Sequence, residues 1–403
     1  MKCLAISNSY PPDHAGGYEL GACNLLESLA SECGWQNTVV ASVRKQKSPE
    51  TDSLQLTGFF PGKLGPGISW WQTRRELLKK HSKVVVGLRD LTEKADIVFI
   101  FNPRRLIYPQ WTSVLASGKP AFVLVSDHWL EDPLASDLFY SKAKKADASP
   151  RLKDGRIQSI YNGISSVSET LNQIKGVLYG SQFLKSKHAA AFSGSAKQTV
   201  AHWGVDINQF PEVPFSESRL KTFGFCSRPE KEKGLDLGLN SIRKLAQKDA
   251  DVQLLIASDL KESSYGRTVL KRIHEDAVLS KHVTLLGHIP HTELHARFYS
   301  RIGILLFPSI WQEPFALTVL EGMSSGALVI GSSTGGTPEV LDESTGYLFD
   351  PEKEDELTAT CMEALKGGTD NLNRVQCGIR RIREAHTLPY MAKVVDAFIR
   401  GLI

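Results

Sequence analysis

Short apolar segments of strand length alternate with helix-like segments along this chain of 403 residues. Such alternation is typical of parallel α/β architecture, because parallel strands need a crossover connection that is usually a helix. We expect strands at 2–7, 37–42, 96–101, 121–125 and 176–179 in the first half, and at 221–226, 252–257, 283–286, 302–307 and 327–331 in the second. Between the strands of the second half we expect helices at 235–247, 262–277 and 292–300. The sequence therefore predicts an α/β fold with two open parallel sheets.

The strand–helix pattern restarts near residue 221, after a segment that suits a linker. Residues 204–214 contain two prolines and show no helical periodicity. A chain of 403 residues is long enough for two domains that each bury a core. We place the first domain at 1–212 and the second at 213–389. Ligands of such folds bind at the carboxyl ends of the strands, so we expect a cleft between the two sheets.

Composition is that of a globular protein, with 41% hydrophobic and 23% charged residues. The longest apolar runs have strand length, so no membrane-spanning helix is expected. The chain enters a strand at residue 2, which leaves no room for a signal peptide. Six scattered cysteines lack metal or redox spacing. Together these features predict a cytoplasmic protein with reduced cysteines.

The net charge of +4 is too small to predict a nucleic-acid partner. Basic side chains nevertheless cluster within 74–83 and again within 142–156. Such clusters could contact an anionic membrane surface, which would place the protein peripherally at the inner membrane. The alternative is a solvated helix face.

Two glutamates, Glu313 and Glu321, lie on either side of an expected helix start. The preceding run 302–307 is a buried strand, and we expect a helix over 315–325 with Pro314 as its first-turn proline. Two carboxylates would repel an anion, so they suit the hydroxyl groups of a sugar and a ribose. The alternative is a solvated first-turn acid and a surface acid.

The start of this helix is itself a candidate anion site. The first amides of a helix have no intrahelical acceptor and lie at the positive end of the helix dipole. A diphosphate fits such a site. The amides concerned belong to Phe315, Ala316, Leu317 and Thr318.

A basic turn follows the first strand of the second half. Ser227, Arg228 and Lys233 lie between this strand and the next helix, where both cations could bind the same anion. A lysine-rich solvated turn is the alternative.

The first half offers weaker signals. Gly16 and Gly17 connect the first strand to a helix, and glycine permits close approach of a ligand. Their spacing is not that of the dinucleotide fingerprint, so hydride transfer is not indicated. Asp127 and His128 follow the strand 121–125 and are candidates for binding a sugar or orienting a nucleophile. A capping Asp and a structural His are the alternative.

Three histidines, His288, His291 and His295, have loosely ligand-like spacing. His291 and His295 could share a helix face, whereas His288 lies upstream of them and no further ligand is evident. We therefore favour a loop beside a nucleotide over a zinc site, and we expect no metal.

Taken in order along the chain, these motifs resemble the retaining glycosyltransferases of the GT-B fold, and most closely their large family four. The resemblance extends over nearly the whole chain and is most specific over 221–350, where the glutamate pair and Gly335-Gly-Thr-Pro-Glu339 lie. It implies two Rossmann-like domains facing across a cleft, with a C-terminal helix at 390–403 that returns to the first domain. One departure is Glu313-Pro-Phe-Ala316, where the family usually has Glu-Gly-Phe-Gly.

The resemblance also implies a role for each motif. Arg228 and Lys233 would neutralise the donor diphosphate, together with Ser227 and the amides of 315–318. Glu321 would bind the ribose and Glu313 the donor sugar. The other expected contacts are His288 and Ile289 beside the base, Gly16 and Gly17 near the diphosphate, and His128 facing the donor sugar, although Asp127 remains an alternative to His128.

The expected function is that of a hexosyltransferase that uses a UDP-sugar, with glucose as the first candidate. The expected acceptor is a sugar or a lipid-linked sugar, and no cofactor or metal is expected. Two alternatives stay open on the same fold: a nucleotide-sugar epimerase or sugar phosphorylase, and a non-catalytic scaffold that binds nucleotide sugars.

Overall fold

A computed structural model describes residues 1–7, 10–11, 17–41, 84–102, 108–128, 171–192, 194, 196–248, 251–353 and 355–403. The chain forms two compact units. The first comprises Met1–Ala201 together with Met391–Ile403, and the second comprises His202–Tyr390. The division falls just before the proline-containing segment 204–214.

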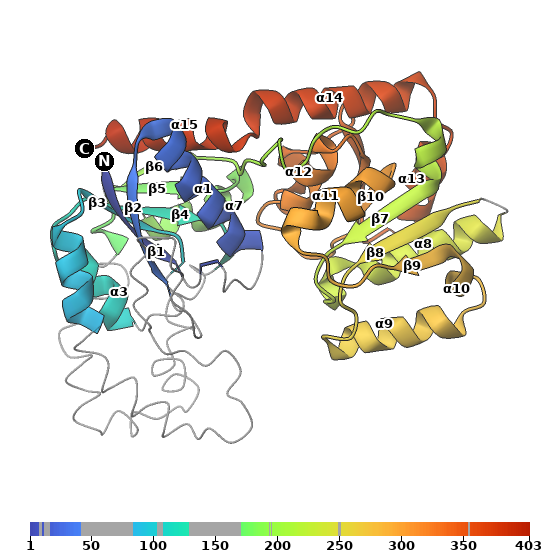
Figure 1. The fold of residues 1–403 in the computed structure, drawn as a ribbon, viewed down its shortest axis with the longest axis horizontal. Coiled ribbons are helices and arrows are strands. Elements are labelled where there is room, and N and C mark those ends of the chain that lie inside the picture. The colour runs from blue at the N-terminus through green and yellow to red at the C-terminus, as the bar shows by residue number, and fades with distance from the viewer. Residues whose placement is uncertain are drawn as a thin grey trace, which may run out of the picture. The chain divides into compact units, whose positions relative to one another are not determined.

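The described residues of the first unit form a six-stranded parallel sheet in the order β2-β1-β3-β4-β5-β6 (Figure 1). Its strands are β1 (Lys2–Ser7), β2 (Gln36–Ala41), β3 (Ile97–Ile100), β4 (Ala121–Val125), β5 (Gly176–Tyr179) and β6 (Lys197–Val200). The three central strands β3, β4 and β5 are buried along their whole length. This explains their continuous apolar sequences, because helices cover both faces of a parallel sheet.

The helices of the first unit are α1 (Gly17–Cys33), α3 (Tyr108–Leu115), α7 (Gln182–His188), the short 3₁₀ helix η3 (Ala189–Phe192) and most of α15 (Leu388–Arg400). Helix α1 is followed by Gly34 at a φ of 68°, a left-handed conformation that suits a helix end. Ser181 is the N-cap of α7, and its hydroxyl accepts a hydrogen bond from the Leu184 amide at 3.1 Å.

The second unit repeats the architecture with a parallel sheet in the order β12-β11-β10-β7-β8-β9. Its strands are β7 (Thr222–Cys226), β8 (Gln253–Ala257), β9 (Val283–Leu285), β10 (Ile304–Phe307), β11 (Leu328–Ser332) and β12 (Gly346–Phe349). Both sheets are therefore parallel and six-stranded over the described residues, as the α/β prediction requires.

Helices connect the strands of the second sheet. The α-helices are α8 (Leu235–Gln247), α9 (Ser264–Glu275), α10 (Leu279–His282), α11 (Leu294–Arg297), α12 (Leu317–Ser324), α13 (Glu356–Ala364) and α14 (Thr369–Ala385). The 3₁₀ helices are η4 (Glu217–Lys221), η5 (Lys231–Lys233), η6 (His291–Glu293), η7 (Tyr299–Arg301) and η8 (Thr337–Glu339). Helix α14 packs against α12 (Figure 1).

Each unit buries a core of its own. In the first unit, aliphatic residues of β1, β3, β4 and β5 cluster with Val84 and Leu88. In the second, residues of β7, β8, β10 and β11 pack against the apolar faces of α8 and α9. No helix in the described part of the chain combines the length and apolarity that crossing a bilayer requires.

Two strands and two helix boundaries differ from the expectations. Strands β6 and β12 lie at sheet edges and are half-exposed, so they lack the apolar run that marks a buried strand. The helix expected over 292–300 is broken into η6, α11 and η7. Helix α12 begins at Leu317 with Ala316 as its N-cap, so Pro314 precedes the helix instead of opening it.

Candidate functional site

An ion pair between Lys233 and Glu313 forms the centre of the candidate site in the second unit. The Lys233 Nζ lies 2.7 Å from the Glu313 Oε1, and the two side chains are only 16% and 10% exposed. The short helix η5 carries Lys233 and ends at Gly234, which has a φ of 72°. A Cβ on Gly234 would lie 1.7 Å from the Pro308 carbonyl oxygen. A glycine is therefore required to bring the basic turn against the end of β10.

Glu313 is also fixed through its other groups. The Ser309 hydroxyl lies 2.8 Å from the same Oε1, and the Gly336 amide donates to the Glu313 carbonyl at 2.8 Å. Gly335, at a φ of 56°, packs so tightly that a Cβ would lie 2.3 Å from the Glu313 carbonyl oxygen. The Gly335-Gly336 turn thus holds the Glu313 backbone, and the cation and the hydroxyl hold its carboxylate.

The start of α12 leaves amides without acceptors. Within the part of the chain that the structure describes, the amides of 315–318 donate to no backbone or side-chain acceptor. The Phe315 ring stacks on His202 with centroids 5.6 Å apart, and the His202 Nε2 lies 2.9 Å from Glu339. A buried aromatic ring therefore fixes the backbone at this helix start, where an anion would be favoured.

Glu321, one turn further along α12, is enclosed by two donors. The His291 Nε2 lies 2.9 Å from its Oε1, and the Tyr299 hydroxyl donates to its Oε2 at 2.6 Å. Burial, followed by the nearby Glu321 charge, raises the pKa of Tyr299 and also the pKa of the Cys226 thiol. Within the described part of the chain, no lysine or arginine forms an ion pair with this carboxylate.

The remaining expected residues of this half lie on loops. Ser227 and Arg228 follow β7 directly, and the Arg228 guanidinium is 60% exposed with Glu230 at 2.8 Å. His288 is exposed, whereas Ile289 is buried. The structure thus places Arg228 and Lys233 in one turn but pairs each of them with a different carboxylate.

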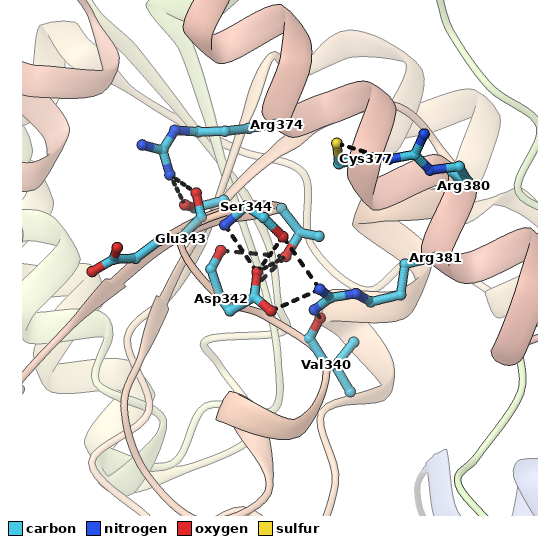
Figure 2. A network of polar contacts seen from close by, with 10 residues as sticks. Val340, Asp342, Glu343, Ser344, Arg374, Cys377, Arg380 and Arg381 are labelled. Carbon is cyan, nitrogen blue, oxygen red and sulfur yellow. Dashed lines mark hydrogen bonds and ion pairs between the residues drawn. The ribbon is translucent and has the colours of Figure 1, made fainter.

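A network of arginines fixes the loop that follows Glu339. Arg381 of α14 donates to the Val340 carbonyl at 2.9 Å and to the Asp342 carboxylate at 2.7 Å. Arg374, two turns earlier on the same face of α14, donates to the Gly346 carbonyl at 2.8 Å and to the Glu343 carbonyl. Figure 2 shows these guanidinium groups converging from one helix on the loop. The turn that contacts Glu313 is therefore anchored from its far end.

The expected residues of the first unit are placed only in part. Gly16 lies outside the described residues, as do the basic segments 74–83 and 142–156, while Gly17 is the first residue of α1. Asp127 accepts a hydrogen bond from the Asn102 amide at 3.3 Å. The His128 ring lies 6.0 Å from Phe183.

Metal binding has no support from the described residues, among which no group of three or more His, Cys, Asp or Glu side chains could hold an ion. His291 and His295 do not converge, because His291 contacts Glu321 and His295 lies 2.9 Å from the Pro211 carbonyl. The second unit instead combines acceptor-free amides and a cation with two largely buried carboxylates. Such a set can hold an anion beside hydroxyl groups.

Sequence reasoning missed several supporting residues. Ser309 and Gln209 lie on separate loops outside any periodic pattern. Tyr299 lies in η7, in a stretch whose apolar periodicity does not reveal its contact with Glu321. Only the Phe-Pro-Ser run before Glu313 gave a signal for one of them. Contacts between residues far apart in sequence, such as Gln209 with His291, have no local signature.

The second unit matches a known protein family. Residues 206–379 match the family described as "Glycosyl transferases group 1". The matched segment contains Lys233, Glu313 and Glu321.

Three known proteins are similar over most of the chain. An uncharacterised 42.6 kDa protein in the cps region of Klebsiella pneumoniae is 29% identical over 360 residues, which are 84% of this chain and 87% of that protein. The GDP-mannose-dependent alpha-(1-6)-phosphatidylinositol monomannoside mannosyltransferase of Mycolicibacterium smegmatis is 27% identical over 77% of this chain and 88% of its own length. The crystal structure of HepE of Anabaena in complex with UDP aligns with a TM-score of 0.68 at 15% identity over 100% of both chains. The fold is the GT-B fold expected from the sequence.

Proposed function

We propose that this chain is a retaining glycosyltransferase that moves a hexose, glucose as the first candidate, from a UDP-sugar to a sugar hydroxyl in polysaccharide or glycolipid assembly. The observation that carries the proposal is the buried Lys233–Glu313 pair within the matched segment 206–379. A cation that is 16% exposed beside acceptor-free helix amides suits a group whose negative charge grows during reaction.

We propose a role for each group from the charge arrangement. The Lys233 ammonium has three N–H donors, and Glu313 uses one of them, so two remain for diphosphate oxygens. Together with the amides of 315–318 and the exposed Arg228, they stabilise the leaving group. Such preorganised donors contribute roughly 3–4 kcal/mol each to a transition state.

The bond between the anomeric carbon and the diphosphate oxygen breaks as the acceptor oxygen bonds to the same carbon. The acceptor proton passes to the departing diphosphate, so no further reactant is needed. Glu313 binds donor hydroxyls in this proposal, and the contacts of Lys233 and Ser309 with its Oε1 hold the carboxylate in place for that role.

The nucleotide of the donor is proposed from relatives. UDP is bound in the HepE crystal structure, which has the same fold, and this supports a UDP-sugar. The name of the mycobacterial relative gives GDP-mannose as its donor, so GDP-mannose is the second candidate.

The proposal is tested with a panel of UDP-sugars and GDP-mannose, read out as released nucleoside diphosphate. We expect one donor to be hydrolysed slowly without acceptor and the Lys233→Ala variant to be slower by about 100-fold. Lys231→Ala is the matched control, because Lys231 lies in the same turn with an exposed side chain, and its rate should equal that of the wild type.

Three results would contradict the proposal. Near-normal turnover of Lys233→Ala would remove the diphosphate contact, and turnover without released nucleotide would indicate an epimerase. Binding of nucleotide sugar with no turnover of any donor or acceptor would indicate the scaffold alternative.

A further inference from the structure

The Glu321 carboxylate, for which the family resemblance implies ribose binding, is held by two neighbouring side chains that this role alone does not require. His291 and Tyr299 contact its two oxygens at 2.9 and 2.6 Å, and the side chain is only 13% exposed. Each oxygen has two acceptor positions, of which one is used by these contacts. One acceptor position on each oxygen remains for a ligand.

The hydrogen-bond partners of Gln209 fix the tautomer of His291. The Gln209 side-chain nitrogen lies 3.0 Å from the His291 carbonyl oxygen, which can only accept. The group at this position must therefore be the Gln209 amide N–H₂, and the same nitrogen lies 2.8 Å from the His291 Nδ1. Nδ1 is then an acceptor, so the ring carries its proton on Nε2 and donates it to Glu321.

Packing holds this arrangement in place. The Ser324 hydroxyl of α12 donates to the Phe210 carbonyl at 2.7 Å, which ties the segment next to Gln209 to the helix that carries Glu321. The Phe210 ring meets His291 and Tyr299 edge-on at 5.2 and 5.5 Å. Tyr299 is fully buried, so its hydroxyl has little freedom to leave Glu321.

We infer that His291, Gln209 and Tyr299 are positioning residues that aim the free acceptor positions of Glu321 at a vicinal diol, and so select ribonucleotides over deoxyribonucleotides. A ribose diol presents two neighbouring hydroxyl donors, which match the two oxygens of one carboxylate. Among the residues that the structure describes, no lysine or arginine pairs with Glu321, so the charge of its carboxylate remains available to these donors. The inference rests on the proposed function, because it concerns the nucleotide of the same donor.

The experiment compares the affinities of UDP and 2′-deoxy-UDP by titration calorimetry, so it needs no turnover. The wild type should bind UDP about tenfold more tightly, since a hydrogen bond to a charged acceptor is lost in the deoxy ligand. In His291→Leu and in Tyr299→Phe the ratio should fall to about twofold, while binding of 2′-deoxy-UDP changes little. Tyr299→Phe removes only the hydroxyl, so it tests the inference even where His291→Leu folds poorly.

Two further variants separate positioning from general packing. His291→Gln keeps an N–H near the Nε2 position and should restore the wild-type ratio. His295→Leu is the matched control, because His295 contacts the Pro211 carbonyl and not Glu321, and its ratio should equal that of the wild type.

The outcomes distinguish this inference from the proposed function. If His291→Leu and Tyr299→Phe weaken both ligands equally, these residues are merely structural and the inference is wrong. If the wild type binds neither UDP nor GDP, the proposed function fails together with the inference. If the wild type binds GDP and not UDP, the affinity ratio of GDP to 2′-deoxy-GDP in the wild type and the same variants tests the inference instead.

Discussion

At the scale of single residues, burial decides which groups of the second unit can carry charge. His386 is 4% exposed and lies 5.5 Å from the His202 ring and 6.1 Å from the Phe315 ring. Burial, with a smaller contribution from the His202 charge, lowers the pKa of His386 to about 4. The aromatic support under the α12 start is therefore built from a histidine that resists protonation.

This pKa predicts a pH-dependent stability. The unfolded His386 has a pKa near 6.5, so the unfolded chain binds its proton more readily than the folded chain. The contribution of His386 to the unfolding free energy is therefore complete above pH 6.5. It is lost as the pH falls from 6.5 to 4, which lowers the unfolding free energy by about 3 kcal/mol. His386→Gln removes the titration, so the difference in unfolding free energy between wild type and variant should shrink toward pH 4. Urea unfolding of the second unit between pH 4 and 7 measures this difference between wild type and variant. A difference that stays constant with pH would contradict the lowered pKa of His386.

At the scale of elements, sequence patterns located the buried parts well and the loops poorly. The helix α8 has the bounds expected from its amphipathic pattern, and the central strands match because both their faces are apolar. The interrupted stretch 291–301 keeps an apolar periodicity, so the pattern cannot show that Phe298, at a φ of −133°, breaks the helix. Likewise, Pro314 suits a first helical turn, but α12 begins only at Leu317. The preceding residue Glu313 instead accepts a hydrogen bond from the Gly336 amide at its carbonyl oxygen.

The turn at Gly335 gives an element-scale prediction. An added Cβ would lie 2.3 to 2.5 Å from the Glu313 backbone, in addition to the strain of a φ of 56°. We expect Gly335→Ala to displace Glu313 from Lys233, lowering transfer more than about tenfold and stability by roughly 2–4 kcal/mol. Transfer rates and urea unfolding measure both effects.

Gly34 offers the matched control for this substitution. It has a φ of 68° but no atom within 4 Å of an added Cβ. Gly34→Ala should therefore cost about 1 kcal/mol of backbone strain and leave transfer unchanged. If the two alanine variants behave alike, strain alone accounts for the requirement at Gly335 and the contact with Glu313 is not needed.

At the scale of the whole molecule, the α/β architecture was predictable because it follows from hydrophobic periodicity repeated over many segments. The return of the chain to its first unit was expected only from the family resemblance. Its physical basis lies in long-range contacts: Trp35 donates to Asp396 of α15 at 2.6 Å, and a Cβ on Gly176 would meet Phe398 and Leu402 at about 3 Å. Neither contact has a local signature in the sequence.

This return helix leads to a prediction about the two units. A chain that ends at Tyr390 loses Met391, Ala392, Val395 and Ile399, which are all buried in the first unit. Their burial contributes roughly 5–10 kcal/mol, comparable to the whole stability of a domain, so the first unit should unfold. The second unit keeps its own core, so calorimetry should show one remaining unfolding transition. UDP at about 100 times its Kd should raise the unfolding free energy of this unit by about 2.7 kcal/mol.

Full-length Ile399→Ala is the graded control. It should lower the unfolding free energy of the first unit alone, by roughly 2–5 kcal/mol. If truncation abolished both transitions, the two units would depend on each other for folding, and the independence of their cores would be wrong.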